Sequence, residues 1–118
     1  MKYLLDTHVL LWSLQGEFSK LGNFSELIQN ENNIILVSVV SYWEITIKQS
    51  LGKLEVPSDL LQAIDNLGFL WINMEIKHIE RLKSLPLLHS DPFDRLLIAQ
   101  SLSDGLHFLT CDQKNFAI

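Results

Sequence analysis

Four short apolar runs recur along the chain, and each is bounded by polar or glycine residues. Runs of this length, rich in branched and aromatic side chains, are typical of buried strands. The predicted strands cover residues 3–5, 34–37, 69–72 and 106–109. Segments with helical spacing separate them, so the pattern favours a single α/β domain over residues 1–118 with a mostly parallel sheet.

Helices are predicted where apolar residues recur every three or four positions. One continuous helix is expected over residues 21–30, because Leu21, Phe24, Leu27 and Ile28 follow that spacing. The other predicted helices cover residues 9–14, 38–50, 59–67 and 75–84, with Ser58 as the cap of the helix at 59–67 and Gly16, Gly52 and Gly68 near helix ends.

A further helix is predicted to begin at the motif Asp91-Pro92-Phe93-Asp94. Asp91 suits the N-cap, and Pro92 suits the first helical position. Asp94 falls in the first turn, on the same face as Asp91. Taken alone, both acids could simply cap the helix and oppose its dipole. A further role for Asp94 therefore depends on whether other carboxylates converge with it.

Other carboxylates do follow the predicted strands. Asp6 directly follows the first strand, Glu44 lies on the helix after the second, and Asp112 directly follows the fourth. Asp94 belongs to the helix that leads into the fourth strand. Sites in open parallel sheets form at the carboxyl ends of the strands. We therefore expect these four acids to converge there, with Asp91 as a cap beside them.

Each of these acids also has a purely structural explanation. Asp6 and Asp112 could cap the turns that they begin. Glu44 could be the capping-box partner of Ser41, or it could pair with Lys48 four residues later. Its apolar neighbours in the sequence favour an inward position.

Four or five carboxylates crowd together in a folded protein only where a cation offsets their repulsion. An all-oxygen ligand set without a Cys or His cluster favours Mg²⁺ or Mn²⁺ over Zn²⁺. Thr7 and Thr110 each adjoin one of the acids, so their hydroxyls could orient a carboxylate or a water molecule, or could only cap a turn.

Composition narrows the class of protein. The 118 residues carry a net charge of −5, with a pI of about 5.2, which argues against a basic nucleic-acid binder. An enzyme acting on nucleic acid stays open, because bound cations reverse the local charge. The single cysteine, Cys111, allows no internal disulfide. The N-terminal apolar run is too short for a signal peptide, and no run approaches the ~18 residues of a membrane span, so a soluble cytoplasmic protein is expected.

An ordered set of motifs, at residues 3–12, 38–45, 52–54, 91–100 and 109–112, resembles the PIN domain. The closer resemblance is to the VapC-type toxins of bacterial type II toxin–antitoxin pairs. It implies a three-layer α/β/α fold with a central parallel sheet of four strands, or five if a short one follows the last motif. It also implies a Mg²⁺- or Mn²⁺-dependent ribonuclease, a homodimer, and inhibition by a small antitoxin that often binds DNA.

The resemblance assigns roles to individual residues. Asp6, Glu44, Asp94 and Asp112 match the four acidic positions that bind the metal and catalyse hydrolysis in the family. Asp91 matches an extra acid of one subgroup. The family's products carry 5′-phosphate and 3′-hydroxyl ends.

Basic and aromatic residues add weaker expectations. Arg95, Lys48 and Lys53 are candidates for contacts with RNA phosphates, although each could equally be solvated or salt-bridged. His8 is expected in packing or at the surface. The tryptophans at 12, 43 and 71 are expected in the core or at a partner interface.

Three questions stay open. Only residues 113–118 follow Asp112, so the fourth strand is either an open edge or precedes a truncated C-terminal strand. An aspartate-based phosphatase is a rival, but the expected Asp-x-Asp pattern is missing, because Thr7 and His8 follow Asp6. A PIN-like scaffold without catalysis is the other rival, and the intact set of acids argues against it.

Overall fold

A four-stranded parallel sheet forms the centre of the computed structural model, which describes residues 1–86 and 91–111. The strands are β1 (Lys2–Leu5), β2 (Ile34–Ser38), β3 (Leu70–Ile72) and β4 (His107–Leu109), and they lie in the order β3-β2-β1-β4. Tyr3 is aligned with Ile35 on one side and with His107 on the other. The four predicted strands are thus confirmed, each to within one residue at either end. A fifth strand after Asp112 would lie outside the described residues.

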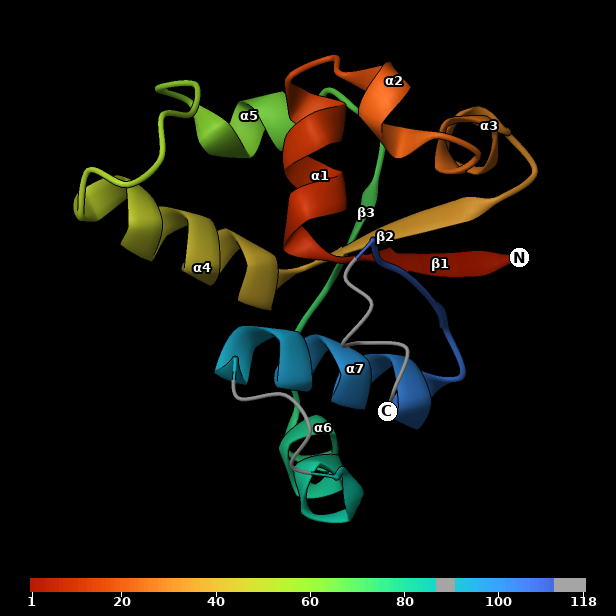
Figure 1. Ribbon diagram of the computed structural model, residues 1–118. Coiled ribbons are helices and arrows are strands. Elements are labelled where there is room, and N and C mark those ends of the chain that lie inside the picture. Colours follow the sequence, from red (N-terminus) through yellow and green to blue (C-terminus); the bar gives the residue numbers. More distant parts are fainter. Residues whose placement is uncertain (87–90, 112–118) are drawn as a thin grey trace.

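Helices cover both faces of the sheet and complete the predicted three-layer α/β/α fold (Figure 1). On one side lie α1 (Thr7–Leu14), α2 (Phe18–Leu21), α3 (Phe24–Gln29), α4 (Val39–Ser50) and α5 (Leu60–Asp65). On the other side lie α6 (Ile76–Arg81), the short 3-10 helix η1 (Leu82–Ser84) and α7 (Pro92–Asp104). In the part of the chain that the structure describes, no helix is long and apolar enough to cross a membrane.

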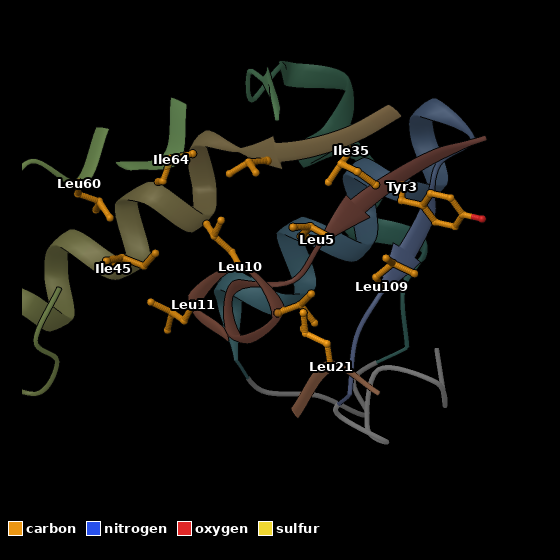
Figure 2. Close-up of a cluster of buried hydrophobic side chains, with 12 residues drawn as sticks. Tyr3, Leu5, Leu10, Leu11, Leu21, Ile35, Ile45, Leu60, Ile64 and Leu109 are labelled. Carbon is orange, nitrogen blue, oxygen red and sulfur yellow. The ribbon is translucent and has the colours of Figure 1, made fainter. Parts of the chain in front are cut away.

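Alternation along the strands divides the core between the two faces. Tyr3 and Leu5 belong to the larger cluster, which fills the space between the sheet and α1, α4 and α5 (Figure 2). Leu4 points the other way and packs with Leu97 of α7. Leu4, Leu5 and Leu97 are fully buried, and burying each such side chain contributes about 1.5–3 kcal/mol.

Two predicted helices are divided in the structure, and the helix expected over 59–67 is shorter, because α5 covers only Leu60–Asp65. The continuous helix expected over 21–30 is wrong: α2 ends at Leu21, and α3 begins at Phe24. Gly22 lies between them with a φ of +56°, a left-handed value that interrupts a helix. The helix expected over 75–84 likewise divides into α6 and η1.

Helix caps agree with the sequence except at α5. Asp91 caps α7 as predicted, because its Oδ1 accepts hydrogen bonds from the backbone N–H groups of Phe93 and Asp94 at 2.9 and 3.4 Å. The cap of α5 is Asp59 and not Ser58, since Asp59 Oδ1 accepts from the N–H of Gln62 at 3.2 Å. Asp is as good a cap as Ser, so the sequence could not separate the two neighbours.

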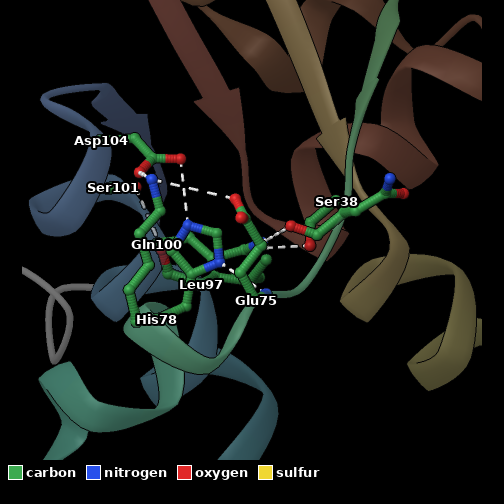
Figure 3. A network of polar contacts seen from close by, with 9 residues as sticks. Ser38, Glu75, His78, Leu97, Gln100, Ser101 and Asp104 are labelled. Atoms are coloured by element: carbon green, nitrogen blue, oxygen red, sulfur yellow. Dashed lines mark hydrogen bonds and ion pairs between the residues drawn. The ribbon is translucent and has the colours of Figure 1, made fainter.

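A buried polar network holds α6 and α7 against the sheet (Figure 3). Ser38 Oγ donates to Gln100 Oε1 at 2.6 Å, and Gln100 Nε2 donates to the carbonyl of Asn73 at 3.3 Å. His78 is fully buried, accepts at Nδ1 from the N–H of Glu75, and lies 3.0 Å from Asp104 through Nε2. The network therefore joins the end of β2 and the segment after β3 to the two helices on that face.

Candidate active site

Asp6 directly follows β1 at the carboxyl edge of the sheet, and it lies beside β4. Its N–H donates to the carbonyl of Leu109 at 3.0 Å, which continues the pairing of β1 with β4. Its Oδ1 caps α1 by accepting from the N–H of Val9 at 2.8 Å. Asp6 is only 3% exposed. The capping role considered from the sequence is therefore confirmed.

The surroundings of Asp6 disfavour its charged form. Burial raises the pKa of Asp6 above its ordinary value, and the nearby negative charge of Glu44 adds to the increase. A hydrogen bond from Thr110, the N–H of Val9 and the electrostatic effect of His8 act in the opposite direction without cancelling it. A cation placed beside Asp6 would therefore be strongly favoured.

Glu44 is buried on the inner face of α4, as its apolar neighbours predicted, and is 3% exposed. Its Oε1 accepts a hydrogen bond from Thr7 Oγ1 at 2.7 Å, and its Oε2 lies 2.7 Å from Lys48 Nζ. Ser41 Oγ lies 3.1 Å from Thr7 Oγ1. Because Thr7 has one hydroxyl hydrogen and gives it to Glu44, Ser41 is the donor in that contact. Of the two pairings considered for Glu44, the one with Lys48 is observed.

Lys48 links this buried acid to the start of α7. The hydrogen bond to Glu44 raises the pKa of Lys48, burial opposes the increase, and the negative charges of Glu44, Asp91 and Asp94 add to it. Asp91 and Asp94 are both half-buried. The N-terminus of α7 therefore lies within electrostatic reach of the ammonium group that contacts Glu44.

The structure thus brings Asp6, Thr7, Glu44 and Thr110 together, and it places Asp91 and Asp94 near Lys48. Asp112, the fourth predicted acid, lies outside the described residues. Within residues 1–86 and 91–111, no group of three or more His, Cys, Asp or Glu side chains is arranged to hold a metal ion. The oxygen donors that are described are nevertheless of the type that Mg²⁺ and Mn²⁺ prefer, so the chemistry of the site fits such an ion.

A family model described as "PIN domain" matches residues 3–117. The chain belongs to the PIN domain family. Among solved structures, it is similar to the crystal structure of VapBC2 from Rickettsia felis bound to a DNA fragment from their promoter. That match has a TM-score of 0.70 and 18% identity, and it covers 100% of this chain and 93% of the other. At this identity the likeness shows the fold. The comparison with curated proteins finds no match.

The basic residues of this PIN domain occupy different environments. Arg95 Nη1 donates to the carbonyl of Pro86 at 2.7 Å, so its side chain holds the backbone that follows η1. Lys53 is exposed just beyond α4. Lys48 is salt-bridged to Glu44. Their contacts with RNA stay predictions.

Trp43 of the PIN domain does not fill the core. It is 54% exposed and makes an edge-to-face contact with Phe93, with 4.9 Å between the ring centroids. Trp12 and Trp71 are partly buried and pack against the larger core cluster. The core expectation is thus wrong for Trp43, and the alternative of a partner interface stays a prediction.

Three residues that position the site were not found by reasoning from the sequence. Ser41 was considered only as a cap, yet it supports Thr7. Gln100 gave no pattern that predicted its burial, although it lies within a motif of the resemblance. His78 gave no usable signal, because histidine is intermediate between the residue types that are usually buried and those that are usually exposed.

Proposed function

We propose that this PIN domain is a Mg²⁺- or Mn²⁺-dependent endoribonuclease. The observation that carries the proposal is the pair of buried carboxylates, Asp6 and Glu44, which follow the ends of the adjacent strands β1 and β2. Lys48 offsets the charge of Glu44, but the burial of Asp6 beside it costs stability unless a further cation compensates that carboxylate. Members of the PIN family are generally nucleases and typically use divalent metal ions, which supports this interpretation.

Asp6, Asp94 and Asp112 are the residues proposed to hold the ion, with Glu44 beside them. A bound divalent ion would lower the pKa of a water molecule and stabilise the negative charge that develops at the phosphodiester. Thr7 orients Glu44 through their hydrogen bond. Thr110 hydrogen-bonds Asp6 and helps to keep its carboxylate charged.

The RNA substrate must be held by local positive charge, because the whole chain carries a net charge of −5. The side chain of Lys48 is 41% exposed, so its ammonium can reach a phosphate while it contacts Glu44. Lys53 and Arg95 are the other proposed contacts. Binding through a few phosphate contacts would weaken as salt concentration rises.

The biological role that we propose is that of a VapC-type toxin of a type II toxin–antitoxin pair, acting on RNA in the cytoplasm. A solved structure that matches over this whole chain is a VapBC complex bound to promoter DNA. That likeness supports a small cognate antitoxin as the partner. By the resemblance to VapC-type toxins, the antitoxin would inhibit the enzyme, and the protein would form a homodimer. Co-expression with a small open reading frame upstream of the gene, followed by size-exclusion chromatography with light scattering, would test both assemblies.

Cleavage of total RNA by the purified protein tests the enzymatic proposal. We expect degradation with Mn²⁺, products with 5′-phosphate ends, and no degradation with EDTA or after Asp94→Asn or Asp6→Asn. Glu80→Gln is the matched control, because Glu80 is an exposed acid that pairs with Lys83, three residues later. Cleavage that persists at an equal rate in Asp6→Asn would refute the proposal for this site and favour a contaminating nuclease. Trapping of a covalent aspartyl-phosphate would favour the phosphatase alternative instead.

A further inference from the structure

Glu44 has both carboxylate oxygens engaged by side chains. Oε1 accepts the hydroxyl hydrogen of Thr7 at 2.7 Å, and Oε2 contacts the ammonium of Lys48 at 2.7 Å. A metal ion bound at Oε2 would lie next to a positive charge on the same oxygen, and like charges at that range repel strongly. Glu44 is therefore better placed to hold Lys48 than to hold a divalent ion.

The pair formed by Lys48 and Glu44 differs from the other lysine–glutamate pairs that the structure describes within a helix turn. In Lys83–Glu80 both side chains are well exposed, at 77% and 58%. In Lys48–Glu44 the acid side chain is only 4% exposed, while the lysine side chain is 41% exposed. An exposed pair contributes little, whereas a buried carboxylate needs its counter-charge. Lys48 thus supplies the counter-charge of a buried acid and differs from a lysine in a pair at the helix surface.

Lys48 also feels the charge of the acids of α7. The negative charges of Asp91 and Asp94 act on its ammonium in addition to that of Glu44. The ammonium therefore contacts the acid of α4 and lies within electrostatic reach of the acids of α7. Metal-dependent phosphodiesterases with two ions use two positive centres, which stabilise the attacking and the leaving oxygens of the displacement.

We propose that Lys48 takes the place of a second metal ion, so that this site binds one divalent ion and completes its positive charge with an ammonium group. The proposal rests on the proposed ribonuclease function and specifies how that site is charged. Asp6, with its acid neighbours, holds the single ion. Glu44 acts as a positioning residue, because it fixes Lys48 and is itself fixed by Thr7.

Titration with Mn²⁺, followed by isothermal calorimetry and by the electron paramagnetic resonance signal of free Mn²⁺, tests the proposal without using activity. The variants are Lys48→Met, which removes both the charge and the hydrogen bond, and Lys48→Gln, which keeps a hydrogen-bond donor and covers the case in which Lys48→Met does not fold. Lys83→Gln is the matched control, since it breaks an exposed pair of the same type. RNA cleavage is measured in parallel for each protein.

We expect one Mn²⁺ per chain in the wild type and in Lys83→Gln, and two in Lys48→Met or Lys48→Gln, because Glu44 then needs another cation. Two ions in the wild type, or one ion in both Lys48 variants, would overturn the proposal. If the wild type still cleaves RNA only with metal in those cases, the ribonuclease function stands and the role of Lys48 falls alone. No bound Mn²⁺ and no metal-dependent cleavage in the wild type would overturn both.

Discussion

Thr7 Oγ1 lies 2.7 Å from Glu44 Oε1, so the first residue of α1 holds the buried acid of α4. The contact joins two helices that follow adjacent strands. Ser41 Oγ lies 3.1 Å from Thr7 Oγ1 and helps to fix the hydroxyl of Thr7. It fixes where the carboxylate points, which the sequence spacing of 37 residues could not specify.

Thr7→Val tests this contact, because valine keeps the shape and removes the hydroxyl. Hydrogen bonds to charged groups contribute about 1.5–3 kcal/mol, so we expect a loss of that order in the free energy of unfolding, measured by urea denaturation. Thr7→Ser should restore most of it. Thr46→Val is the matched control, since among the described residues the Thr46 hydroxyl bonds to the carbonyl of Tyr42 within its own helix. An equal loss in both variants would contradict the assigned role of Thr7.

Gln100→Leu should destabilise the fold through the network that it shares with Ser38. Ser38 and Gln100 are both fully buried, and replacing Gln100 leaves the Ser38 hydroxyl and the Asn73 carbonyl without this partner. An unsatisfied buried polar group costs about 1–3 kcal/mol, and thermal denaturation should show a correspondingly lower Tm. The exposed Gln49→Leu provides the comparison. A Tm that is unchanged in Gln100→Leu would show that the network carries no stability.

Asp6→Asn should stabilise the protein in the absence of metal at neutral pH. Burial raises the pKa of Asp6 above the ordinary 3.8, so its contribution to stability is complete below that pH and is lost as pH rises through the folded-state pKa. Asparagine can still cap α1, and it carries no charge. Thermal melts from acidic to neutral pH should therefore show a smaller decline in Tm for the variant than for the wild type.

Added Mn²⁺ should make the wild type more stable than Asp6→Asn. An ion that binds only the folded wild type raises its Tm, while Asp6→Asn should gain little. The same melts with and without EDTA measure both effects. A wild type that is no more sensitive to rising pH than the variant, or an equal gain with Mn²⁺ in both, would count against a strained metal-binding carboxylate at this position.

Asp104→Asn should remove an acid-sensitive contribution to stability. Burial acts to raise the pKa of Asp104, but its contacts with Lys77 and His78 outweigh burial and lower the pKa below 3.8. A lowered pKa contributes stability above the ordinary value, and this contribution is lost as pH falls through the folded-state pKa. Wild-type stability should thus decline in acid more steeply than that of the variant. Glu31→Gln, at an exposed turn, should leave the wild-type decline in place.

Much of the fold could be predicted from local pattern. The four strands, the cap at Asp91 and the inward position of Glu44 all follow from apolar spacing and the chemistry of helix ends. The continuous helix over 21–30 could not be corrected in advance, because Gly22 is tolerated within a helical pattern until its actual φ is known. The choice between Ser58 and Asp59 likewise depends on backbone geometry between two good caps.

The sequence by itself determined which residue types stand after each strand, and so predicted acids at one edge of a parallel sheet. The pairing of Glu44 with Lys48 also follows from their spacing on one helix. Tertiary structure alone decided the partners from other elements: Thr7 holds Glu44, while Thr110 bonds Asp6. The physical reason is that a carboxylate finds its hydrogen-bond donors through space, from other helices and strands, whereas the hydrophobic pattern encodes only which face of its own element turns inward.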